Sequence, residues 1–98
     1  MFIEKSSRAT STYMVNVGSE TVHVGAKGFE DYTTHKDKSR KRNYLARHKN
    51  ENWNLSVIDT AGFWARWLLW NTPTIKESIS DIKRKFQLKD LVDSVYKK

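Results

Sequence analysis

Hydrophobic and polar residues alternate near the amino terminus, which is typical of a strand with one buried face. The alternation runs from Tyr13 to Val24 and is interrupted by Gly18 and Ser19, a pair suited to a two-residue turn. The pattern predicts an antiparallel hairpin over residues 12–25, with Tyr13 opposite Val24 and the apolar side chains on one face.

Helical spacing replaces alternation in the second half of the chain. Residues 61–70 are apolar almost all round, with Arg66 the clearly polar exception, so this helix is predicted to be the buried centre of the fold. Thr60 is suited to begin it and Pro73 to follow its end. The preceding residues 55–58 favour a short extended segment.

An amphipathic helix is predicted after Pro73, where Thr74 and Glu77 form a capping box. Its apolar face consists of Ile75, Ile79, Ile82 and Phe86. The helical spacing then repeats at Leu88, Leu91, Val92, Val95 and Tyr96. This repeat predicts a short fourth helix at the end of the chain.

A basic helix is predicted between the hairpin and the tryptophan-rich segment. Residues 36–49 contain good helix formers and no breaker, and Thr34 lies three residues before Asp37 as in a capping box. Its apolar content is limited to Tyr44 and Leu45, so most of this helix is expected to face solvent or a partner.

These elements predict an α+β fold, with an N-terminal β-hairpin followed by three or four short helices around the tryptophan-rich central helix. Residues 1–11 are polar and without periodicity, and we interpret them as a flexible arm. Residues 12–98 then form a single small domain, made of the hairpin 12–25 and a helical part 34–96.

Composition narrows the possible functions. The 98 residues include no cysteine, which excludes a disulfide framework and a thiolate zinc site. No signal-peptide run and no apolar stretch of about 20 residues is present, so we expect a protein made in the cytoplasm without a transmembrane segment. The net charge of +7 favours an acidic partner such as nucleic acid, an anionic membrane face or an acidic protein surface.

Most of that charge lies in the predicted basic helix. The candidate partner-binding residues are its seven cations, Lys36, Lys38, Arg40, Lys41, Arg42, Arg47 and Lys49. They are offset within the helix by Asp37 alone, so this segment carries +6 of the net +7. Such clustering is expected of a surface that contacts phosphates, and it is equally expected of a solvated helix face that serves solubility.

The four tryptophans also have two interpretations. They could stack on bases or anchor the chain in a groove of a protein partner. Trp64 and Trp67 are more consistent with a packed core, and Trp53 and Trp70 are the possible aromatic anchors.

The sequence gives little support for a catalytic function. His35 and His48 could be combined with Asn52 as a nuclease-like metal site, but no paired carboxylate or second ligand motif accompanies them. A phosphate-binding glycine loop and a nucleophile elbow are also absent from the sequence. We therefore expect a non-catalytic protein with no catalytic residues, metal or cofactor.

Four motifs resemble those of small uncharacterised proteins encoded by nucleocytoplasmic large DNA viruses, the giant viruses. They are GFEDYTTHKD at 28–37, RKRNYLARH at 40–48, ENW at 51–53 and TAGFWARWLLWNTPT at 60–74. The resemblance extends over residues 27–86 and leaves out the hairpin and the tail, and residues 55–58 make a longer connector than is usual in the family.

The resemblance implies a viral setting rather than a mechanism. Our first interpretation is a small structural protein of the virion, a minor capsid or capsid-lining component that bridges other virion proteins through the basic helix and the chain ends. The alternative is a non-specific protein that binds DNA or RNA during genome packaging. A third is an inhibitor or adaptor that acts on a host protein.

Overall fold

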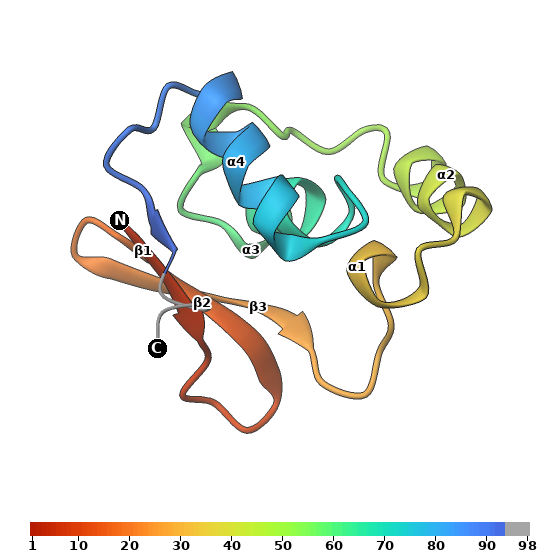
Figure 1. Ribbon diagram of the computed structural model, residues 1–98, viewed down its shortest axis with the longest axis horizontal. Helices are drawn as coiled ribbons and strands as arrows, with labels where there is room; N and C mark the ends of the chain where they lie inside the picture. Colours follow the sequence, from red (N-terminus) through yellow and green to blue (C-terminus); the bar gives the residue numbers. More distant parts are fainter. Residues whose placement is uncertain (94–98) are drawn as a thin grey trace.

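The structure is a computed structural model that describes residues 1–93. A sheet forms one layer, and helices cover one of its faces (Figure 1). The strands are β1 (Phe2–Lys5), β2 (Ser11–Val17), β3 (Glu20–Ala26) and β4 (Val92–Asp93). The helices are α1 (Tyr32–His35), α2 (Lys38–Arg47), α3 (Ala61–Trp64) and α4 (Ile75–Lys85), with a 3₁₀ turn η1 (Leu55–Val57) and a π-helix η2 (Ala65–Leu69). The predicted α+β fold is confirmed.

The sheet has the strand order β3-β2-β1-β4. Strands β2 and β3 form the predicted antiparallel hairpin, in which Tyr13 pairs with Val24 and Val15 with Val22. The turn between them uses Gly18 at φ +59°, a left-handed conformation that costs glycine little. The predicted hairpin is therefore confirmed in its register as well as its place.

The first strand corrects the expected flexible arm over residues 1–11. Phe2–Lys5 pair with β2 in an antiparallel ladder, and Ile3, opposite Val15, is completely buried. Because the strand is short, its alternation is too brief to be recognised in the sequence, whereas the ladder and the buried isoleucine stabilise it in the fold. The amino terminus is thus part of the core.

The helical layer is centred on α3 and η2, as predicted. Phe63, Trp64 and Leu68 are completely buried, and the core also contains the inward face of the sheet. At the end of η2 the backbone N–H of Trp70 donates to the carbonyl of Ala65, an i to i−5 bond of 3.0 Å. Leu68 and Leu69 of η2 are buried, whereas Trp67 and Trp70 are half-buried.

Helix α4 packs against this centre through its predicted apolar face. Ile75, Ile79 and Ile82 are buried, and Thr74 caps the helix as predicted, with the N–H of Glu77 donating to Thr74 Oγ1. The reciprocal bond of a capping box is not formed, because Glu77 Oε1 accepts from the Thr74 hydroxyl and not from its backbone N–H. Within the described part of the chain, no helix is long and apolar enough to cross a membrane.

Two local predictions are wrong. Leu55–Val57 form the 3₁₀ turn η1 rather than an extended segment. The predicted fourth helix is absent from residues 88–93, where the chain turns into β4, while Val95 and Tyr96 lie outside the described residues. Strand β4 pairs in parallel with β1, and the Val92 N–H donates to the Met1 carbonyl at 2.8 Å, a distant partner that helical spacing cannot reveal.

Candidate functional site

The predicted basic helix is two helices. Asp31 begins α1 in a capping box, in which Thr33 N–H donates to Asp31 Oδ1 and Thr34 Oγ1 accepts from the Asp31 N–H. Asp37 begins α2 by accepting from two backbone N–H groups. Lys36 lies between them at φ +56° and ends α1. Thr34 therefore belongs to a different cap from the expected one.

Two of the seven candidate cations are bonded to backbone carbonyls of a distant loop of the protein. Lys36 Nζ donates to the Pro73 carbonyl at 2.7 Å, and Lys41 Nζ donates to the Asn71 carbonyl at 2.6 Å. Arg66, which is half-buried, donates from Nη1 to the Trp70 carbonyl at 3.2 Å. These cations satisfy backbone carbonyls of the segment that follows η2. Lys36 and Lys41 thus hold α1 and α2 onto the loop after η2.

The surroundings of Lys41 agree with a structural role. Its ammonium lies 5.1 Å from the ring centre of Tyr32. Burial lowers the pKa of Lys41, and the neighbouring charge of Arg66 lowers it further, while Asp81 acts in the opposite direction. An ammonium held in this way is poorly placed to meet an external anion.

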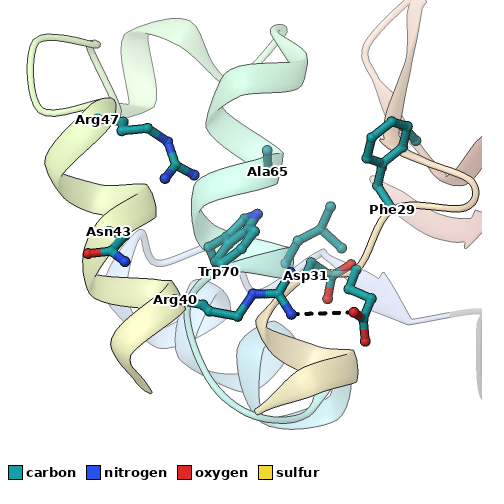
Figure 2. Close-up of a pocket in the computed structure, with 11 residues that line it drawn as sticks. Phe29, Asp31, Arg40, Asn43, Arg47, Ala65 and Trp70 are labelled. Carbon is teal, nitrogen blue, oxygen red and sulfur yellow. Dashed lines mark hydrogen bonds and ion pairs between the residues drawn. The ribbon is translucent and has the colours of Figure 1, made fainter. Parts of the chain in front are cut away.

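A second set of side chains from α2 lines a cleft. Arg40, Asn43 and Arg47 lie on one side of the helix because they are three and four residues apart. The cleft has a volume of about 630 Å³. Trp70 lies on its floor, and Phe29 lies across from α2 (Figure 2).

The opposite wall of the cleft comes from the end of β3 and the following turn. Gly25, at φ +82°, lets β3 pass close to η2, because an added Cβ would lie 3.2 Å from Leu69 Cδ1. Phe29 follows with 79% of its side chain exposed. Arg40 Nη1 lies 3.3 Å from Glu30 Oε1, an exposed ion pair across one end of the cleft.

The remaining three cations point away from the core. Lys38, Arg42 and Lys49 are exposed, and the first two are four residues apart on the outer side of α2. Helices α1 and α2 project at one end of the molecule (Figure 1), so this outer side is open to a large partner. The five cations of the cleft and the outer side are the part of the predicted basic surface that is not bonded to backbone carbonyls of the loop after η2.

The tryptophans occupy distinct environments. Trp64 is buried, and its indole N–H donates to the Ile58 carbonyl at 2.7 Å. The guanidinium of Arg66 lies 4.2 Å from the ring centre of Trp67 and 5.4 Å from that of Trp53. Of the two predicted anchors, Trp53 is half-buried and packs on this guanidinium, whereas the half-buried Trp70 lines the cleft.

His35 and His48 flank an aromatic column rather than a metal site. Tyr44 and Trp70 are stacked in its centre, with His48 4.4 Å from Tyr44 and His35 5.3 Å from Trp70, measured between ring centres. Among residues 1–93 no group of three or more His, Asp or Glu side chains is arranged to hold a metal ion.

Sequence reasoning missed three residues of the cleft. Phe29 has only a weak signal, a single aromatic residue among turn-forming neighbours, which could have marked it as exposed. Asn43 gives no signal, since a lone asparagine in a helix is ordinary, and Glu30 gives none because charged residues are common beside a turn. Their common position depends on how α2 lies beside η2 and the turn after β3.

Comparison with known proteins gives one partial likeness. Residues 3–48 match a family described as Family of unknown function (DUF5754). The matched part spans β1, β2, β3, α1 and α2, and stops before the tryptophan-rich helix. No curated protein and no solved structure matches the chain.

Proposed function

We propose that the protein is a non-catalytic binding protein that contacts nucleic acid without sequence preference. The observation that supports this most is the division of the basic residues. Lys36 and Lys41 are bonded to carbonyls of the fold, but five other cations lie on the two open sides of the α2 region. Three of these five are arginines, whose guanidinium groups suit phosphate oxygens.

Counterion release makes the proposal quantitative. Each phosphate neutralised on duplex DNA contributes about −0.9 to the slope of log affinity against log salt concentration, so five contacts give about −4.5. Binding at physiological salt is then expected in the range of about 1 to 100 μM, as for other non-specific contacts.

The test is the affinity for a random-sequence duplex, measured by fluorescence anisotropy at several salt concentrations. The variant removes the outward cations, Lys38→Gln, Arg42→Gln and Lys49→Gln. We expect the slope to become shallower by about 2.7 and the affinity to fall, because three phosphate contacts are lost.

A matched control removes the same number of charges elsewhere. Lys76→Gln, Lys83→Gln and Lys89→Gln lie in and after α4, and these side chains are also exposed. An equal loss of slope in both variants would show that binding follows net charge, not the α2 region. An unchanged affinity in the first variant would refute the proposal.

A structural role in the virion is the second candidate, as a minor capsid or capsid-lining component bound to other virion proteins. Phe2 and Val92 favour it, since they are paired neighbours in β1 and β4 and both are exposed, at 48% and 39%. The giant-virus resemblance of residues 27–86 supports the same setting.

This candidate predicts a copy number per virion that follows capsid symmetry, measured by quantitative mass spectrometry of purified particles. It also predicts that Phe2→Ser with Val92→Ser lowers incorporation into particles, because the apolar contact is lost. A copy number that scales with genome length would favour nucleic-acid binding instead.

A further inference from the structure

The cleft beside α2 contains a combination of side chains that differs from the outer side of the helix. The outer side presents cations alone, which can contact phosphates but cannot hold a planar group. The cleft adds two aromatic rings, Phe29 and Trp70, and the side-chain amide of Asn43 (Figure 2). Its volume of about 630 Å³ lies within the ordinary range of ligand pockets, roughly 300 to 1,000 Å³.

The two aromatic rings of the cleft differ in how firmly the surrounding residues hold them. Trp70 is held in place, because its ring lies parallel to that of Tyr44 with the ring centres 4.4 Å apart. Phe29 is 79% exposed and follows Gly28 at φ +90° in the turn after β3. A large apolar side chain left this exposed at the mouth of a cleft becomes buried when a flat group stacks against it.

The polar groups of the cleft favour a base with its phosphate. Arg47 forms no ion pair within residues 1–93, so its guanidinium is available, and Figure 2 shows it directed into the space above Trp70. Asn43, four residues earlier on the same side of α2, offers both a donor and an acceptor. Arg40 is paired with Glu30 and closes one end of the cleft.

We propose that this cleft takes an unpaired base of single-stranded nucleic acid, with Phe29 stacking on the base and Arg47 contacting the adjoining phosphate. The inference rests on the proposed nucleic-acid binding and adds a preference for single strands over duplex. A base within a duplex is stacked between its neighbours and cannot enter a recess without being flipped out, whereas a base of a single strand can. Lys38, Arg42 and Lys49 then follow the backbone outside the cleft.

The experiment compares a labelled single strand of about 12 nucleotides with the duplex of the same sequence, both by fluorescence anisotropy at one salt concentration. Phe29→Ala is expected to weaken single-strand binding by at least about 5-fold, the lower end for the loss of one stacked base, and to leave duplex binding unchanged. Phe2→Ala is the matched control, because Phe2 is also exposed but lies on β1. We expect it to change neither affinity.

The polar side of the cleft has its own test. Arg47→Gln is expected to weaken single-strand binding more than Lys83→Gln, which removes the same charge from α4. Since both side chains are exposed, thermal unfolding is expected to show that each variant folds like the parent.

The two proposals fail in different ways. Equal affinity for single strand and duplex, unaffected by Phe29→Ala but lowered by loss of Lys38, Arg42 and Lys49, would overturn the base-binding cleft and leave non-specific binding standing. No measurable binding to either nucleic acid at low salt would overturn both.

Discussion

The ring of Trp70 lies on that of Tyr44 with an angle of 1° between their planes and 4.4 Å between their centres. Trp70 follows the π-helix η2, and Tyr44 is the buried residue of α2. This stack joins the projecting helices to the core, and it also fixes one boundary of the cleft. The stack therefore links the packing of α2 to the shape of the cleft.

Replacement of Tyr44 should separate α2 from the core. Tyr44→Ala is expected to lower the free energy of unfolding by about 3 kcal/mol, because a large buried ring and its stacking partner are lost. Tyr44→Phe keeps the ring and should cost less than about 1 kcal/mol. Chemical denaturation measures both values, and equal losses in the two variants would show that the hydroxyl, not the ring, is responsible.

Alkaline pH should weaken the same junction. Burial raises the pKa of Tyr44 from 10.0 to about 12, with Glu51 contributing in the same direction. Between these values the folded protein keeps a proton that the unfolded chain has lost, so stability is complete below pH 10 and declines as the pH rises toward 12. A tyrosinate absorbance step near pH 12 that disappears in Tyr44→Phe would identify the group.

Lys41 and Arg42 are neighbours in sequence with different expected roles. Lys41→Met removes the donor to the Asn71 carbonyl and should lower the free energy of unfolding by about 1 to 2 kcal/mol. Arg42→Met, on the outer side, should change it by less than about 0.5 kcal/mol. Thermal or denaturant unfolding of the pair distinguishes them. If Arg42→Met lowered the free energy of unfolding more than Lys41→Met does, Lys41 would have no structural role.

The amino-terminal strand should be essential to the fold. Ile3 is completely buried, and Ile3→Ala is expected to cost about 2 to 5 kcal/mol. The neighbouring Phe2→Ala, at an exposed position, should cost much less. If Ile3→Ala unfolded at the same denaturant concentration as the parent, β1 would contribute nothing to stability and the interpretation of residues 1–11 as an arm would return.

Features that depend on neighbours in sequence could be predicted from the residues alone. Gly18 and Ser19 set the hairpin register, since the turn and the alternation agree on the pairing of Tyr13 with Val24. The burial of α3 and η2 follows from a helix with almost no polar face, and the cap at Thr74 follows from a local hydrogen-bonding pattern.

Features that depend on residues far apart in the sequence were decided only by the tertiary structure. Strand β1 pairs with β4, whose residues lie about ninety positions later in the sequence. The four residues of β1 are too few for their alternation of apolar and polar side chains to predict a strand. Lys41 and Arg42 look equivalent in sequence, because the role of a cation depends on which carbonyls or carboxylates come within reach. The cleft likewise arises only when α2 packs beside η2 and the turn after β3, bringing Arg47, Trp70 and Phe29 from three separate segments to one place.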